Sequence, residues 1–228
     1  QAWFAWKIVG LISDSVWIRV FSTILFVFSP TMMVRVGLWT SLASHFLILT
    51  ALYLIYRSKQ SNRILWWTLL IAAASLIHFY LLAMILALWL ASLCDQIFVG
   101  KNLSNKKCFS ELAVVFAVLF CLMWQAGYFS VSASSGAAGG YGTFRLNLLA
   151  PFDSRGWSYI LRPIPMQIDF GNGFNYFGIG ILIIACFAIF AKLKKDANLP
   201  QILTFKLHPF LYLCFITISL SLTTNPIL

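Results

Sequence analysis

The stretch ILWWTLLIAAASLIHFYLLAMILALWLASLCDQIFVG, residues 64–100, decides the fold of this chain. As one helix, its 37 residues would be about 55 Å long, whereas the hydrocarbon core of a bilayer is about 30 Å thick. Basic residues flank it on both sides: Arg57, Lys59 and Arg63 before it, and Lys101, Lys106 and Lys107 after it. We therefore expect a tight helical hairpin with both ends on the inner side and a turn near residues 75–80.

The composition of the whole chain also indicates a lipid environment. Of its 228 residues, 61% are hydrophobic and 10% are charged, against roughly 45–50% and about 25% in soluble domains. Mean hydropathy is +0.88. A soluble fold of this length could not bury so much apolar surface. The composition excludes a water-soluble globular protein, a disordered chain and a nucleic-acid-binding module.

Further apolar segments suggest more helices on either side of the hairpin. They cover residues 2–12, 16–28, 38–56, 111–128 and 177–191, and a last helix runs from His208-Pro209 to about residue 222. The predicted fold class is an all-α, polytopic transmembrane bundle of about seven to eight helical segments with a long outer loop. We expect residues 1–228 to form one transmembrane domain, a fragment that lacks the N-terminal helices and the C-terminal part of a longer protein.

The basic residues predict the orientation of the bundle. The net charge is +10, and loops rich in Lys and Arg stay in the cytoplasm. Four basic residues fall on the predicted outer side, namely Arg35, Arg145, Arg155 and Arg162, and Lys7 falls inside a helix. Eleven fall on the predicted inner side: Arg19, Arg57, Lys59, Arg63, Lys101, Lys106, Lys107, Lys192, Lys194, Lys195 and Lys206. This bias predicts that the long 130–175 loop faces the periplasm or the cell exterior.

Soluble-enzyme motifs are absent from the sequence. It contains no Walker loop, dinucleotide fingerprint, HExxH or GxSxG. Its five cysteines form no CxxC pair, so neither a disulfide nor a metal site is indicated. We predict no cofactor, with a bound divalent cation as the alternative. We expect membrane lipid as a partner.

The outer loop carries most of the candidate site residues. Loops longer than about 12–15 residues are usually functional or disordered, and this one is too aromatic for disorder; it either covers a substrate or is a structural re-entrant loop. Its arginines, like Arg35, either bind a lipid phosphate through their fork of donors or snorkel to the interface. Asp153 and Asp169 are weak candidates for a general base or metal ligand, with ion pairs to Arg155 or Arg145 as the alternative.

Two histidines are candidates for the same outer site. His45 is expected about two turns into the helix at residues 38–56, and an ionisable residue within a membrane segment is a functional hypothesis. The alternative is a buried histidine hydrogen-bonded to a neighbouring helix. His78 lies at the expected hairpin turn beside Tyr80, from where it could reach the same cavity.

Three blocks resemble a large bacterial family of uncharacterised multi-spanning inner-membrane proteins that is regarded as similar to GT-C glycosyltransferases. They are FSPTMMVRVGLWTSLASHFLIL at residues 28–49, GGYGTFRLNLLAPFDSRGWSYIL at 139–161 and FGNGFNYFGIG at 170–180. The chain departs from the family pattern at Leu38, where histidine is frequent, and at Asn172, where the family has glutamate. The resemblance implies Arg35, His45, Asn147, Asp153 and Tyr176 as site residues.

The resemblance further implies a reaction. GT-C enzymes transfer a sugar from a polyprenyl-phosphate donor at the outer leaflet, with an acidic base in an early outer loop, which here would precede Gln1. Arginine would neutralise the phosphate leaving group. Together with the candidates that the outer loop and the hairpin turn supply by position and charge, the predicted substrate-binding set is Arg35, His45, His78, Arg145, Asn147, Arg155, Asn172 and Tyr176. A polysaccharide transporter, flippase or polymerase, or a non-catalytic membrane subunit, are the alternatives.

The orientation can be tested by labelling single cysteines in a cysteine-free background. We predict that an impermeant thiol reagent added outside the cell labels Ser134→Cys in the outer loop and spares Ser104→Cys on the inner side. Permeabilised cells should label both variants. Labelling of Ser104→Cys alone from outside would show that the orientation is the reverse of the predicted one.

Overall fold

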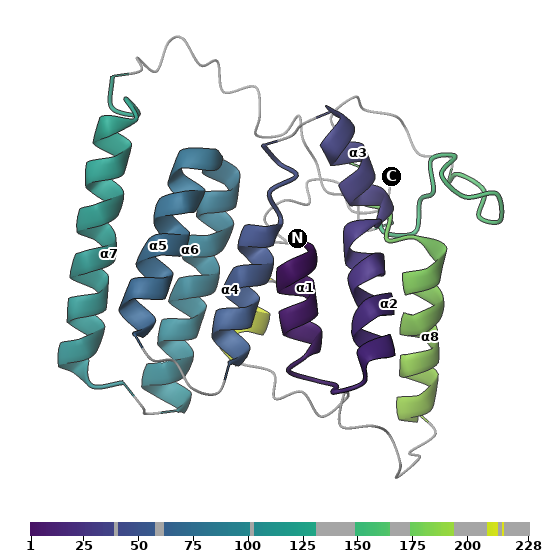
Figure 1. Cartoon of the computed structure of the whole chain (residues 1–228), viewed down its shortest axis with the longest axis horizontal. Coiled ribbons are helices and arrows are strands. Elements are labelled where there is room, and N and C mark those ends of the chain that lie inside the picture. Colours follow the sequence, from purple (N-terminus) through teal and green to yellow (C-terminus); the bar gives the residue numbers. More distant parts are fainter. Residues whose placement is uncertain are drawn as a thin grey trace.

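The computed structural model describes residues 1–38, 41–57, 62–100, 103–130, 149–164, 174–193, 209–213 and 216. Within these residues all regular structure is helical and no strand occurs. Most of the helices stand side by side with alternating direction (Figure 1). They are α1 (Ala2–Val9), α2 (Val16–Val27), α3 (Pro30–Leu38), α4 (Phe46–Tyr56), α5 (Arg63–Ile77), α6 (Phe79–Cys94), the π-helix η1 (Asp95–Val99), α7 (Asn105–Gln125) and α8 (Ile179–Leu193).

The predicted hairpin is confirmed in α5 and α6, which lie against each other (Figure 1). The break is a single residue, His78, whose backbone is extended with φ −164° and ψ 130°. Its Nδ1 accepts the N–H of Tyr80 at 3.2 Å, so the imidazole caps α6. The hydroxyl of Tyr128, which follows α7, donates to the Ser75 carbonyl at 3.2 Å. The ends of α5 and α7 are thereby joined beside the hairpin turn.

The core lies between α4, α5, α6 and α7, whose facing residues are fully buried. Trp67, Ile71, Ile85 and Trp89 are all at most 1% exposed. Large apolar side chains on other faces remain uncovered, since Trp17 is 71% and Phe187 is 73% exposed. Apolar surface on this scale needs a partner other than water, and the acyl chains of a membrane fit it.

Two helices in the described part of the chain are long and apolar enough to cross a membrane. They are Phe79–Val99, which joins α6 to η1, and Asn105–Gln125. Val16–Val27 and Pro30–Gly37 meet at a 45° bend and would add a third span if they cross together. The other apolar helices are shorter. A membrane protein with two or three candidate spans is therefore the architecture that the described helices support.

The expectation of one helix over residues 38–56 is wrong. Pro30 ends the preceding helix, as expected, but it also begins α3, because proline fits the first position of a helix. The chain then turns at residues 41–45, where the His45 N–H bonds the Ala43 carbonyl at 2.8 Å. Ser41 and Ser44 favour such turns because their hydroxyls compete for backbone groups. Helix α4 begins only at Phe46.

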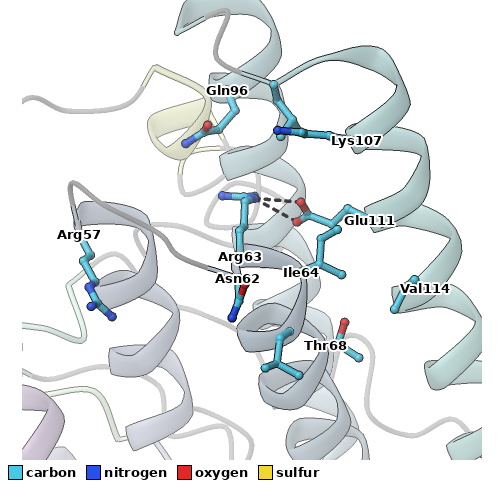
Figure 2. A pocket seen from close by; sticks show the side chains of 11 residues that line it. Arg57, Asn62, Arg63, Ile64, Thr68, Gln96, Lys107, Glu111 and Val114 are labelled. Carbon is cyan, nitrogen blue, oxygen red and sulfur yellow. Dashed lines mark hydrogen bonds and ion pairs between the residues drawn. The ribbon is translucent and has the colours of Figure 1, made fainter.

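A buried ion pair connects the start of α5 to α7 (Figure 2). It lies at the end of α5 opposite the hairpin turn (Figure 1). Arg63 Nε donates to both carboxylate oxygens of Glu111, at 3.1 and 3.0 Å. Trp89 Nε1 donates to Glu111 Oε1 at 2.8 Å, and Arg63 Nη1 donates to Ser92 Oγ at 3.0 Å. Glu111 is 0% exposed. The carboxylate thus fixes α5, α6 and α7 relative to one another.

Removing the charge of Glu111 should destabilise the fold strongly. Glu111→Gln keeps an oxygen for Trp89 but leaves Arg63 buried without its carboxylate, which costs about 3–5 kcal/mol. We expect a clearly lower melting temperature of the detergent-solubilised protein. The double variant Arg63→Met/Glu111→Leu should lose less, because apolar pairs often replace buried ion pairs at little cost. Equal melting temperatures for Glu111→Gln and wild type would show that the ion pair does not hold the helices.

Candidate functional site

Arg35 joins three segments that are distant in the sequence. It lies in the last turn of α3 and is partly buried. Its Nη1 donates to Nε2 of His45, which precedes α4, and its Nη2 donates to Asn175 Oδ1 at 3.3 Å. The side chains of Arg35, His45 and Asn175 form what we call the Arg35 site. The site lies at the same end of the layer as the α5–α6 turn (Figure 1).

The contact between Arg35 and His45 fixes the protonation of the imidazole. A guanidinium has donors only, so Nε2 of His45 must carry a lone pair and the ring is neutral. His45 lies outside the apolar helices, in the turn before α4. Burial, and then the positive charge of Arg35, lower the pKa of His45 to about 4. His45 therefore acts as a neutral acceptor at physiological pH.

The segment around Tyr176 is held tightly against the start of α3. Thr31 Oγ1 donates to the Tyr176 carbonyl at 3.0 Å, and the Phe177 N–H donates to the Pro151 carbonyl at 3.1 Å. Gly178 has φ +87°, and a Cβ there would lie 3.2 Å from Pro30 Cδ. Only glycine combines this backbone conformation with so close an approach. The chain is therefore shaped locally to bring Asn175 to Arg35.

Tyr176 places an unsatisfied hydroxyl in this region. Its side chain is 1% exposed, and its OH has no hydrogen-bond partner among the residues that the structure describes. Buried tyrosine hydroxyls usually have a partner. The ring packs edge-on against Phe174, with centroids 6.3 Å apart. Tyr176 directly follows Asn175 in the chain, but within the described residues no contact joins its side chain to Arg35.

Asp153 organises the 149–164 loop through its carboxylate. Oδ2 accepts Arg155 Nε at 3.3 Å, so the predicted ion pair to Arg155 is confirmed. Oδ1 accepts the backbone N–H of Ile164 at 3.1 Å and of Arg155 at 3.3 Å. Arg155 has a left-handed φ of 43°, and Ser154 Oγ donates to the Leu161 carbonyl at 2.8 Å. These contacts give Asp153 and Arg155 a structural role in shaping the loop.

The other sequence-based candidates have different outcomes. His78 caps α6 and stacks on Tyr80 at 5.4 Å, and within the described residues nothing joins it to Arg35. Asn175 was not among the candidates, although it directly precedes Tyr176 and carries an amide. Four candidates lie outside the described residues: Arg145, Asn147, Asp169 and Asn172.

The charge of Arg35 gives the site its chemistry. Its two partners, His45 and Asn175, are neutral, and no carboxylate pairs with it in the described ranges. The guanidinium has five N–H donors, of which these contacts use two. Buried charges are normally paired, so an anion would complete the site. Among the described residues, no group of three or more His, Cys, Asp and Glu is placed to hold a metal ion.

The neutral state of His45 predicts a pH-dependent stability. Because its folded-state pKa is below its ordinary value of 6.5, the folded state binds fewer protons, and stability falls as the pH drops from 6.5 toward 4. The melting temperature of the wild type should fall from about pH 7 to about pH 5 more than that of His45→Gln, which keeps an acceptor for Arg35 without titrating. Parallel decreases for the two proteins would contradict a neutral, buried His45.

Comparison with known proteins gives a family for the whole chain. No curated protein matches the chain, and no solved structure does. A family model described as "Domain of unknown function (DUF6311)" matches residues 1–228. The chain therefore belongs to the DUF6311 family.

Proposed function

We propose that the chain is part of a membrane glycosyltransferase of GT-C type. It would transfer a sugar from a polyprenyl-phosphate donor to an acceptor at the outer face of the bacterial inner membrane. In this proposal the chain is a polytopic bundle of about seven to eight helical segments, the 130–175 loop is periplasmic, and the Arg35 site binds the phosphate of the donor.

The observation that supports this proposal best is the partly buried cation of the Arg35 site. Arg35 is held in place by the neutral acceptors His45 and Asn175, so its charge stays available for an anion. A planar guanidinium binds phosphate oxygens in a bidentate manner. As the sugar leaves, charge builds up on the donor phosphate, and a fixed cation there stabilises the transition state. The same contacts would position the donor before transfer.

The surface next to Arg35 suits the lipid part of such a donor. On α3, Met33 and Val36 are 46% and 54% exposed, and Phe28 just before the helix is 63% exposed. A phosphate at Arg35 would therefore have apolar surface beside it for the prenyl chain. The resemblance of residues 28–49, 139–161 and 170–180 to a GT-C-like family supports the same donor class. Asp153 is engaged with Arg155 and two backbone amides, so we assign it no catalytic step.

Arg35→Ala should abolish the preference of the protein for polyprenyl phosphate over the uncharged polyprenol of the same length. A lost charge-assisted hydrogen bond costs roughly 1.5–3 kcal/mol, which is about a ten- to hundredfold loss of affinity. Arg35→Lys should rescue binding only in part, because lysine lacks the bidentate fork. Binding of both lipids to the detergent-solubilised protein measures the effect, and sugar transfer in membranes follows it.

Arg162→Ala is the matched control, because Arg162 is an exposed arginine of the neighbouring 149–164 loop. We expect it to bind polyprenyl phosphate as the wild type does. If folded Arg35→Ala protein keeps full affinity, Arg35 is a snorkelling anchor and the proposed donor site is wrong. Phosphate-dependent donor binding without sugar transfer would instead favour a flippase or a non-catalytic subunit.

A further inference from the structure

A polar pocket lies at the end of α5 opposite the α5–α6 turn, and Figure 2 shows the side chains that line it. In Figure 1 this is the other end of the helical layer from α3, the helix that carries Arg35. It has a volume of about 760 Å³ and is lined from the end of α4, the start of α5, η1 and the start of α7. Its polar wall carries Arg57, Asn62, Arg63, Gln96 and Lys107, and Glu111 lies beside Arg63 (Figure 2). We call it the Arg63 pocket.

The balance of charges in the Arg63 pocket favours an anion. Glu111 is its one acid among the lining residues, and both oxygens of that carboxylate are already bound to Arg63. Arg57 and Lys107 have no carboxylate partner within the described ranges. Figure 2 shows these two cations on either side of Arg63. The pocket thus carries two positive charges beyond the buried ion pair.

Backbone and hydroxyl groups of the Arg63 pocket add to this preference. Helices α5 and α7 both begin at the pocket, and no side chain within the described residues caps either N-terminus. The N-terminal end of a helix carries a partial positive charge. Thr68, in the wall, has a buried hydroxyl without a hydrogen-bond partner in the described part of the chain. An anionic ligand with several oxygens would meet all of these groups.

The remaining wall of the pocket is apolar and partly exposed at the surface of the molecule. Leu65 of α5 and Val114 of α7 line it and are 51% and 39% exposed, and Ile64 of α5 also lines it. A small soluble anion has no apolar part that could pack against this wall. A lipid does, because its headgroup needs cations while its acyl chains need apolar surface. Basic pockets between the ends of membrane helices commonly bind lipid headgroups.

We propose that the Arg63 pocket binds the phosphate headgroup of an anionic phospholipid. Lys107 and Arg57 contact the phosphate, and Asn62 and Gln96 form hydrogen bonds with the polar part of the headgroup. The acyl chains lie along Leu65 and Val114. This site is separate from the proposed donor site, because it lies at the other end of α5 and shares no residue with it. Bound lipid would join the ends of α4, α5 and α7.

The test compares two neighbouring lysines of α7. Lys107 lines the pocket, whereas Lys106 is exposed in the same helical turn and does not line it. Native mass spectrometry of the protein would measure binding of dioleoylphosphatidylglycerol, with dioleoylphosphatidylcholine, whose zwitterionic headgroup has no net charge, as the comparison. We expect tighter binding of phosphatidylglycerol. Lys107→Gln should weaken it about fivefold, and Lys106→Gln should leave it unchanged.

Three results would overturn the proposal. Equal affinity for the two lipids would remove headgroup selectivity, and equal losses in Lys106→Gln and Lys107→Gln would indicate diffuse surface charge. Displacement of phosphatidylglycerol by excess inorganic phosphate would assign the pocket to a soluble phosphate. Melting temperatures confirm that both variants fold. Arg35→Ala should retain phosphatidylglycerol, which keeps this test independent of the donor site.

Discussion

Charged side chains in a bundle of apolar helices must lie near the helix ends or be paired, because a lone charge in hydrocarbon is costly. The described helices follow this constraint. Arg35 is in the last turn of α3, Arg63 begins α5, and Lys107 is in the first turn of α7. Glu111 lies one turn deeper and is paired. Charge therefore collects at the two ends of the helical layer, and both candidate sites lie there.

The two ends use their arginines differently. Arg63 is neutralised by a buried carboxylate that also accepts a hydrogen bond from Trp89, so it holds helices together. Arg35 is positioned by neutral groups on two other segments, so it keeps its charge for a ligand. This difference separates a structural arginine from one suited to binding. In the Arg63 pocket, Lys107 and Arg57 supply the charge that Arg63 no longer offers.

The sequence predicted those features that depend on length and local spacing. The break near His78 follows from the excess length of residues 64–100 and their basic flanks, and the Asp153–Arg155 pair follows from a separation of two residues. The prediction of one helix over residues 38–56 was wrong. Pro30 begins a separate helix and residues 41–45 form a turn, and the apolar character of this segment reveals neither feature. Asn175 was missed because its contact with Arg35 spans 140 residues. The pairing of Arg63 with Glu111, across 48 residues, was equally invisible.

Mapping where a donor-type lipid binds tests directly whether Arg35 holds the donor phosphate. A polyprenyl phosphate with a photoreactive group near its phosphate would be crosslinked to the protein in membranes, and the labelled peptides identified by mass spectrometry. If Arg35 binds the donor phosphate, we expect labelling on α3 and around Asn175 and Tyr176, which an excess of unlabelled polyprenyl phosphate suppresses and polyprenol does not. Labelling at the Arg63 pocket instead, or equal suppression by polyprenol, would contradict this role of Arg35.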